Sequence, residues 1–407
     1  MLHFDSEGYY GAEDASLTLS QLQNLPKENA MASMKGLEKR EGLEEFLSSN
    51  DRHFLIDVSI PKVLFCSGRS VLDLIEHGVS KYLNFISVQA IAVVSVDGSS
   101  WEVPTTRRKI FQDKNLKLGE KRAIMELFKS TGSARGSQAI QSSANLGITD
   151  EMRNGLDENL LDGSVVEYLK SIFIDRTELV CGLVNGVCMI AQPASQVSTR
   201  YFLQRLEILI SSLSVYDDGC PLLVPMYGNS DFPQAFARMA SVGGAVYILN
   251  ADEAKIRSEV SSSCRFVSNT LETASKLDTT VIHGISCIES KPEDSTGPTI
   301  SVILDHSRPL EEFPTFAISL PSSDSGAGST NVCPPGHTLI HFARLANQST
   351  DTAAVDAHMR AFTRDRTVLF HTVLLGPSEP VGEDVFSLDS DFEFASNMFG
   401  NLVTVEP

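Results

Sequence analysis

The chain has 407 residues with 52 acidic and 33 basic side chains, which gives a formal net charge of −19 at pH 7. This excess of carboxylates argues against nucleic acid as a partner, because phosphate backbones are bound by clustered lysines and arginines. It argues in the same way against broad electrostatic attraction to anionic lipid. The length is sufficient for two domains, and no run of about 18 apolar residues predicts a membrane span.

The cysteines and histidines favour a cytoplasmic protein without a metal site. Seven cysteines are scattered along the chain, an odd number that includes no Cys-x-x-Cys pair. The nine histidines show no His-Glu-x-x-His motif and no spacing typical of metal ligands. Scattered cysteines are typical of free thiols in a reducing cytosol.

The first residues predict the end of a parallel strand. Residues 1–5 are strand-like and end in Asp5, and Tyr9-Tyr10-Gly11 follows shortly after. In dinucleotide-binding folds, an acid ends the second strand about 20 residues after a Gly-x-Gly-x-x-Gly turn. Asp5 fits that acid, so we expect the chain to begin one βα unit late.

The next hundred residues predict a mixture of helices and strands. Residues 27–50 are charged and predict surface helix, whereas 54–58 alternates as a strand does. An amphipathic helix is predicted over 70–76, with Gly78 after its end.

From about Lys114 to Ser212 the apolar period becomes helical. Between the first two candidate helices, residues 130–163 are rich in Gly, Ser and Asn and predict a long loop. The candidate helices are 118–128, 165–174, 179–190 and 202–213. On the residues alone, an ordinary helical core explains these apolar positions.

The stretch 225–249 predicts a turn, a helix and a short buried strand. Pro233 suits a first helical turn, and Gly243-Gly244 predicts the helix end. Asp231 and Arg238 are seven residues apart, about two turns at roughly 3.6 residues per turn, so both fall near one face. That spacing displays an acid and a base together, although an ordinary solvated helix face has the same pattern.

The remainder of the chain returns to strands and indicates an α/β protein. Strands are predicted at 266–267, 281–287, 299–304, 316–320, 337–343 and 367–375. A closing helix is predicted at 391–402.

Two motifs in this order resemble a known family. The residues Tyr227-Gly228-Asn229-Ser230-Asp231-Phe232-Pro233-Gln234, followed by Phe236-Ala237-Arg238, resemble the Tyr-Gly-x-Gly-Glu-Leu-Pro-Gln and Phe-x-Arg motifs of Rab GDP-dissociation inhibitors and Rab escort proteins. The sequence departs from the motif at Ser230, Asp231 and Phe232. Residues 3–18 and 61–128 resemble the same family.

The resemblance implies a flavoprotein-like fold that carries no catalytic activity and no cofactor. Domain I, Rossmann-like with mixed sheets, would comprise 1–112 and 211–407, and a small all-helical domain II would comprise 113–210. The implied partners are GDP-form Rab GTPases, Rab geranylgeranyltransferase and a geranylgeranyl lipid, with transient membrane contact. The chain would be an accessory subunit of protein geranylgeranylation in vesicle transport.

The resemblance also implies residue roles. Tyr10, Asp231 and Arg238 match family residues that contact the GTPase. Val165 falls where escort proteins carry an exposed aromatic that docks the prenyltransferase, although core packing also suits a valine there. Residues 165–213 would wall the lipid cavity, with Gly182 and Ala191 among them.

Within the family, two segments favour an escort protein: 110–116 ahead of Glu120-Lys121-Arg122, and 165–170. A GDP-dissociation inhibitor that recycles prenylated Rab is the main alternative. An FAD-dependent or nicotinamide oxidoreductase is weaker, because the glycine turn that would hold a pyrophosphate is not in the sequence. A remnant that binds no Rab is a further alternative.

Overall fold

The computed structural model describes the following residues: 2–4, 8–9, 11, 14–24, 33–132, 158–216, 221–251, 279–292, 294, 297–304, 308–324, 328–347 and 352–375. Structural statements below refer to these ranges. The expected strand 266–267, the expected helix 391–402, Asp5 and Tyr10 lie outside them.

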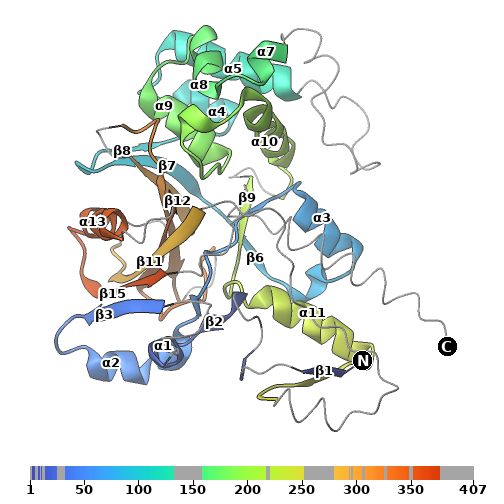
Figure 1. The fold of residues 1–407 in the computed structure, drawn as a ribbon, viewed down its shortest axis with the longest axis vertical. Helices are drawn as coiled ribbons and strands as arrows, with labels where there is room; N and C mark the ends of the chain where they lie inside the picture. The colour runs from blue at the N-terminus through green and yellow to red at the C-terminus, as the bar shows by residue number, and fades with distance from the viewer. Residues whose placement is uncertain are drawn as a thin grey trace.

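A mixed eight-stranded sheet forms the centre of the fold (Figure 1). Its strands, in spatial order, are β3 (Ser33–Lys39), β15 (Val368–Leu375), β11 (Thr279–Glu289), β14 (His337–Asn347), β13 (Thr315–Ser322), β12 (Thr299–Leu304), β7 (Ala90–Ser95) and β8 (Ser100–Glu102). All neighbours run antiparallel except β12 and β7, which are parallel. Four of the strands predicted after residue 249 are therefore confirmed as β11 to β14, and the fifth as β15.

One face of this sheet is covered by α13 (Ala353–Phe362) (Figure 1). Val355 and Met359 of α13 pack against Ile282 and Phe342 of the sheet in a small buried cluster. The opposite face belongs to the main hydrophobic core, which also includes apolar side chains of the helical segment. The sheet is thus buried on both sides, as its apolar strands require.

The described elements between residues 107 and 212 are helices, and we call this part the helical segment. It contains α4 (Arg107–Gln112), α5 (Leu118–Gly132), α7 (Glu158–Leu161), α8 (Val165–Ser171), α9 (Thr177–Cys181), η5 (Gly182–Val187), η6 (Ala194–Gln196) and α10 (Thr199–Ser212). These helices gather at one end of the molecule, at the top of Figure 1. None of the helices in the described ranges combines the length and the apolar composition that crossing a bilayer requires.

The predicted helix at 179–190 is divided in the structure. α9 continues into η5, a single π-helical stretch, and the helix then ends. The buried side chain of Asn185 donates two hydrogen bonds, to the carbonyl oxygens of Ile190 (2.7 Å) and Gln192 (2.8 Å). These bonds satisfy two carbonyl groups of the non-helical chain that follows η5, so the helix ends before residue 190.

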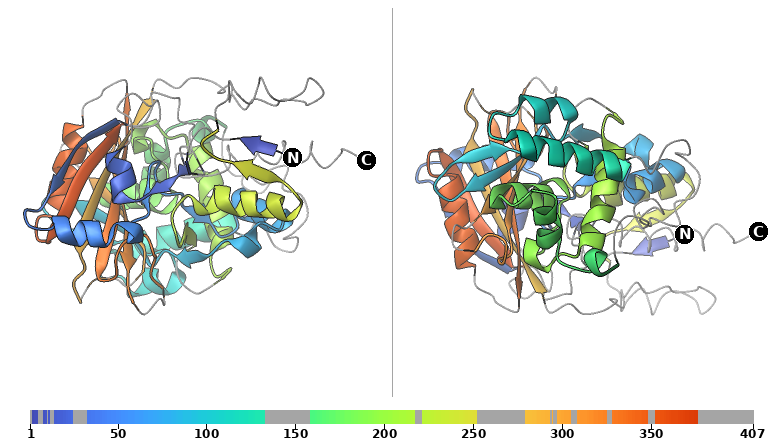
Figure 2. Two further views of the ribbon diagram at one scale, coloured as in Figure 1. Left: turned by 90° about the horizontal axis from the view of Figure 1, so that it is seen from below. Right: turned by 90° about the horizontal axis from the view of Figure 1, so that it is seen from above.

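The third part of the molecule consists of small sheets and short helices (Figures 1 and 2). The sheets pair β1 (Leu2–Phe4) with β10 (Val246–Ile248), β2 (Ser16–Leu17) with β4 (Ile56–Asp57), and β5 (Leu64–Phe65) and β6 (Phe85–Ser87) with β9 (Leu222–Pro225). The helices are α1 (Leu19–Gln23), α2 (Glu44–Ser49), η2 (Asp51–His53), α3 (Arg69–Glu76), η3 (Ser80–Tyr82) and α11 (Asp231–Val242). α3, β9 and α11 share a second hydrophobic cluster.

Two local predictions in this part are wrong. Residues 27–50 were expected to be helical, but 33–39 form β3 at the edge of the large sheet and only 44–49 form a helix. Strand β10 exists as predicted but is not buried, since Val246 and Ile248 are exposed. In both cases the pairing partner decides the structure: β15 for β3, and β1 for β10.

Candidate functional site on helix α11

Helix α11 begins and ends where its sequence predicts. Pro233 occupies the third helical position, where the missing N–H has no intrahelical partner to lose. At the other end, Ala245 N–H donates to the Ala240 carbonyl (3.0 Å) and Gly244 N–H donates to the Ser241 carbonyl (3.0 Å). With φ +90° at Gly244, these bonds form a Schellman motif that fixes the end of the helix.

One side of α11 is buried and the other carries a polar stripe. Phe232 and Ala235 are buried in the cluster shared with α3, with Phe236 and Met239 packed beside them. The side facing away presents Asp231, Gln234, Arg238, Ser241 and Val242, which we call the α11 stripe. At about 100° per residue, Asp231 and Arg238 are only about 20° apart around the helix axis. The predicted display of an acid and a base on one face is confirmed.

The turn that leads into α11 is held by a buried carboxylate. Oδ1 of Asp57 accepts hydrogen bonds from Ser16 Oγ (2.5 Å) and from Asn229 N–H (2.8 Å), and Ser16 Oγ accepts from Ser230 N–H (3.0 Å). Gly228 has φ +85°, and a Cβ there would lie 2.5 Å from Asp57 Oδ1. Only glycine lets the turn approach this carboxylate so closely.

The side chain of Asn229 joins the same turn to the chain after β4. Its Oδ1 accepts from Lys62 N–H (2.9 Å), and its Nδ2 donates to Ser59 Oγ (2.9 Å) and to the Ile60 carbonyl (2.9 Å). Ser59 Oγ in turn donates to Asp14 Oδ1 (2.9 Å). Both ends of the Asn229 amide are satisfied, so the position of the α11 start relative to β4 is fixed.

The two acids of this site are harder to ionise than ordinary carboxyl groups. Burial raises the pKa of Asp57 to about 7, against the lowering effect of its bonds from Ser16 and Asn229, and nearby Asp14 and Asp231 raise it further. Burial also raises the pKa of Asp231 to about 6, and a hydrogen bond from the Tyr227 backbone opposes this. Oδ2 of Asp57 is buried and has no hydrogen-bond partner among the described residues. The start of α11 therefore changes charge near neutral pH.

Arg238 is exposed and lies above an aromatic ring. Its guanidinium is 5.4 Å from the ring centroid of Tyr82 in η3. A planar guanidinium over an aromatic face is held by a cation–π interaction, which reduces the number of side-chain conformations without removing the donors from solvent. Arg238 is thus oriented by Tyr82 and accessible to a partner.

The structure adds residues that the sequence patterns did not reveal. Val242, at 77% exposure, continues the α11 stripe, and Val246 and Ile248 of β10 are exposed just beyond the Schellman turn. Asp57 was not expected either, because it is one acid among 52 and its partners lie up to 172 positions away in the chain. The sequence signal for Val242 was an apolar residue at a position that helix spacing places on the same side as Asp231 and Arg238.

The remaining predicted site residues are placed differently. Tyr10 lies outside the described residues. Val165, expected to contact a prenyltransferase, begins α8 and its side chain is fully buried in the main core, so it presents no surface to a partner in this structure. Core packing, the alternative considered for Val165, is what the structure has.

Gly182, which was expected to line a lipid cavity, lies at a tight contact in this structure. A Cβ on Gly182 would lie 3.0 Å from Val103, 3.2 Å from Trp101 and 3.3 Å from Val93. Gly182 therefore packs against β7 and β8, at the junction between the helical segment and the sheet. Ala191 is buried in the main core.

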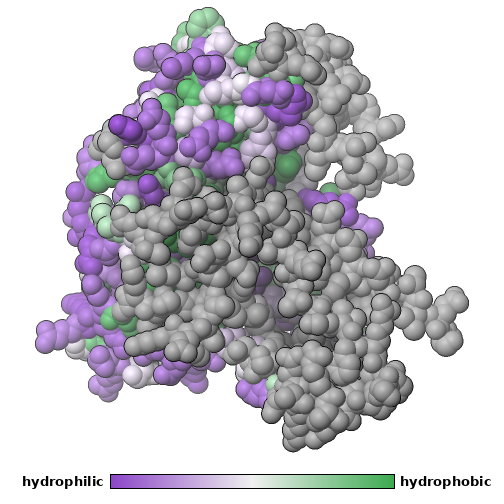
Figure 3. Space-filling model, in the orientation of Figure 1, coloured by the Kyte–Doolittle hydropathy of each residue, from purple (hydrophilic) through white to green (hydrophobic). Residues whose placement is uncertain are grey.

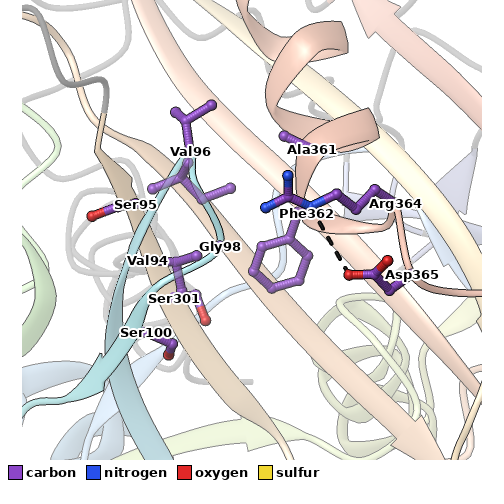
Figure 4. Close-up of a pocket in the computed structure, with 11 residues that line it drawn as sticks. Val94, Ser95, Val96, Gly98, Ser100, Ser301, Ala361, Phe362, Arg364 and Asp365 are labelled. Atoms are coloured by element: carbon purple, nitrogen blue, oxygen red, sulfur yellow. Dashed lines mark ion pairs between the residues drawn. The ribbon is translucent and has the colours of Figure 1, made fainter.

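No cluster of metal ligands accompanies the α11 stripe in the described ranges. Within them, no three His, Cys, Asp or Glu side chains lie close enough to hold a metal ion. A hollow of about 280 Å³ lies between β7, β12 and the end of α13 (Figure 4). α13 and α11 lie on different sides of the molecule (Figure 1). Arg364 and Asp365 form an ion pair at its rim (4.0 Å), and serine and valine side chains line its other side. None of the predicted site residues lines it.

The fold as a whole is that of a known class. It is similar to the crystal structure of a Rab GDI from Plasmodium falciparum, with a TM-score of 0.63 at 15% identity, covering 98% of this chain and 92% of the other. The predicted fold class is therefore confirmed. The family model described as "GDP dissociation inhibitor" matches residues 1–313, so the chain belongs to the GDP dissociation inhibitor family.

Curated relatives carry names of both branches. A guanosine nucleotide diphosphate dissociation inhibitor from Arabidopsis thaliana is 30% identical over 288 residues, covering 67% of this chain and 56% of the relative. Rab escort protein 1 from the same plant is 25% identical over 284 residues, covering 61% of this chain and 49% of the relative. The chain thus spans about half the length of these relatives, and the similarity does not separate the two branches.

Proposed function

We propose that this chain is a Rab-binding accessory protein that binds GDP-form Rab GTPases through the α11 stripe. Family membership supports this, and one observation carries it: half-buried Asp231 and exposed Arg238 lie on one side of a helix fixed at both ends. Tyr10 is proposed as a third contact, and Val242, Val246 and Ile248 extend the surface with exposed apolar groups.

A rigid stripe suits discrimination between nucleotide states. The switch regions of a GTPase are ordered differently with GDP and with GTP. A surface that fits only one arrangement binds that state more tightly, and the difference in affinity sets the selectivity. Because α11 is held by the Asp57 carboxylate and the Schellman turn, its stripe has little freedom to adapt to the other state.

We favour the escort role within this function. The chain would present Rab to Rab geranylgeranyltransferase without catalysing the reaction itself, then shield the lipid and deliver the product to membranes. A twenty-carbon geranylgeranyl chain exposed to water costs up to roughly 15 kcal/mol, at about 0.8 kcal/mol per CH₂, so it needs an apolar shelter. The helical segment, with its continuous apolar core, is the proposed location.

A GDP-dissociation inhibitor that recycles prenylated Rab is the second candidate. The relatives named above include one of each kind. The two roles differ in substrate, since an escort binds unprenylated Rab and supports its prenylation, whereas an inhibitor extracts prenylated Rab from membranes. A prenylation assay with purified transferase, run beside a membrane-extraction assay, separates them.

Titration calorimetry with Rab loaded with GDP, or with a non-hydrolysable GTP analogue, tests the proposed site. Arg238→Ala and Tyr10→Ala should each weaken GDP-form binding at least about tenfold, or roughly 1.4 kcal/mol, because Arg and Tyr are typical interface anchors. Asp231→Ala should weaken it less, since this shorter acid reaches its partner through water.

Arg364→Ala is the matched control, because it removes an exposed guanidinium at the α13 end of the sheet. It should leave binding unchanged. The stability of the Arg238→Ala and Arg364→Ala variants should also stay close to that of wild type, because both arginines are exposed. Equal binding by wild type and by every α11 variant would exclude the α11 stripe as the Rab site.

A further inference from the structure

The segment 107–129 has a net positive charge, whereas the chain as a whole is negative. It holds eight Lys and Arg against three Asp and Glu, a local charge of +5 in a chain of −19. Two of the three acids are turned to internal contacts. Asp113 accepts from Trp101 Nε1 (2.9 Å) and Leu116 N–H (2.9 Å), and buried Glu120 accepts from Lys117 N–H (2.7 Å). The segment therefore presents more exposed cations than exposed acids, and Lys109 is paired with Glu102 (2.7 Å).

Two large apolar side chains are exposed among these cations. Phe111 of α4 is 58% exposed and Leu118 of α5 is 65% exposed. The exposed cations near them in the sequence include Arg108, Lys114, Lys117 and Arg122. We call these six residues the α4–α5 basic surface. Arg107 Cζ lies 5.8 Å from the ring centroid of Phe111, so a cation also covers this exposed aromatic side chain.

The α4–α5 basic surface is held in shape by contacts beneath it. α4 and α5 contact each other, and Lys121 Nζ donates to the Phe111 carbonyl (3.0 Å) at the end of α4. Arg176 donates from Nη1 to the Asn115 carbonyl (2.9 Å) in the connection. Ile110, Leu116 and Ile124 occupy the buried side, so Phe111 and Leu118 have no room to turn inward.

The position of this surface in the fold leaves it at one end of the molecule. Figure 2, right, looks onto that end, where α4 and α5 (teal) lie across the face of the helical segment. In Figure 3 the same end, at the top, shows hydrophobic side chains scattered among hydrophilic ones. The α11 stripe lies toward the opposite end, at the lower right of Figure 1.

The chemistry of the surface selects its partner. Clustered Lys and Arg recognise anionic lipid headgroups, and Phe and Leu between them enter the boundary between headgroups and acyl chains. The centre of a protein interface is instead depleted in lysine, and two of the four cations here are lysines. The negative charge of the rest of the chain would repel the same membrane, which leaves this end as the favoured contact.

We propose that the α4–α5 basic surface docks on anionic phospholipid bilayers, with Phe111 and Leu118 inserted at the headgroup level. The acidic composition of the whole chain argued against general attraction to lipid, but the charge is distributed so that one end has the opposite sign. The docking requires no Rab, so it stands apart from the proposed Rab-binding function.

Flotation of the purified chain with lipid vesicles tests this. Vesicles of phosphatidylcholine with phosphatidylserine should bind the chain, pure phosphatidylcholine vesicles should bind it weakly, and added salt should release it. Lys117→Glu with Arg122→Glu should lower binding to phosphatidylserine vesicles at least about tenfold. Phe111→Ala with Leu118→Ala should lower it severalfold and leave the salt dependence in place.

Arg52→Glu with Arg364→Glu is the matched control, since it makes the same change in net charge at exposed arginines outside the helical segment. It should retain most of the binding. Absence of binding to phosphatidylserine vesicles, or equal loss in the control, overturns the proposal. The proposal is also overturned if the chain binds an acidic soluble protein in a salt-dependent way but does not bind vesicles. That outcome would indicate a protein partner. Rab–GDP titration of the Lys117→Glu/Arg122→Glu variant should be unchanged, which separates failure of this proposal from failure of the Rab site.

Discussion

Asp57 and Gly228 together set where α11 begins. The carboxylate needs two donors on one oxygen, and the turn supplies one of them only because residue 228 has no side chain. The raised pKa of Asp57 is the electrostatic cost of this arrangement, because burial is only partly offset by the two hydrogen bonds. A function that depends on Asp231 and Arg238 therefore also depends on Asp57, which is buried.

Gly228→Ala should destabilise the protein more than Gly42→Ala. Both glycines have nearly the same backbone conformation, φ +85° and +82°, so both variants lose about 1–2 kcal/mol from the left-handed region. At Gly42 nothing lies within 4 Å of the added Cβ, whereas at Gly228 the Cβ meets Asp57 Oδ1 and Ser16 Oγ. Urea unfolding should show at least about 1 kcal/mol between the two variants from this overlap. Equal losses would mean that the turn can move away from Asp57 at no cost.

At the level of elements, the contact between the helical segment and the large sheet depends on small residues. Gly182 lies against Val93, Trp101 and Val103, and Gly186 lies 3.2 Å from Ile91 at its missing Cβ. The four-residue spacing places both glycines on the same side of the helix, where the π-helical stretch η5 meets β7 and β12. Close approach here joins the two parts into one core.

Gly182→Ala should destabilise the protein although alanine favours helix. The added methyl meets three buried or half-buried side chains, and overpacking of this kind costs about 1–3 kcal/mol. Gly119→Ala is the matched control, because Gly119 is also helical and nothing lies within 4 Å of its Cβ. It should gain up to about 1 kcal/mol from helix propensity. The measurement is chemical denaturation of both variants; a gain in both would show that the junction has free space.

Elements with strong local signals could be predicted from the sequence, and those decided by distant partners could not. α11 followed from Pro233 and the Gly243-Gly244 pair, and β12 followed from the mostly apolar, β-branched run at residues 299–304. β3 was mistaken for a helix because charged residues fit a surface helix and a surface strand equally well. Its pairing with β15, more than 300 residues later in the chain, makes it a strand. Among the site residues, the faces of Asp231 and Arg238 were set by helix spacing, but the burial of Val165 came from packing against α10 and its neighbours.

For the whole molecule, buried titratable groups give stability two opposing dependences on pH. His283 Nδ1 donates to the Val58 carbonyl (3.1 Å), so its Nε2 accepts from His341 Nδ1 (2.8 Å), and both rings are neutral. Burial lowers the pKa of His283 to about 4 and that of His341 well below its usual value. Their contribution is present above about pH 6.5 and is lost as the pH falls toward 4.

Asp57 acts in the opposite direction. Its pKa in the folded state, about 7, exceeds the ordinary value of 3.8, so its contribution is fully present below pH 3.8 and is lost as the pH rises through 7. Asp57→Asn removes this titration and keeps a carbonyl acceptor for Ser16 and Asn229. Between about pH 5 and 7, wild type should lose stability relative to the variant by about 1 kcal/mol per pH unit, measured by urea unfolding. A difference that does not change with pH would contradict the raised pKa.

The hydrogen bonds that hold the start of α11 also determine when it can form. They join Ser16 to Ser230, 214 positions apart, and Asp57 to Asn229, 172 positions apart. The whole helical segment lies between these partners in the chain, and its helices close over much shorter loops. Contacts of such long range pay the largest entropy of loop closure and form late in folding. During synthesis, a ribosome must pass residue 230 before the first strands of the chain can find the turn that completes the α11 stripe. Any pause before that point would leave α11 without the hydrogen bonds that fix its start.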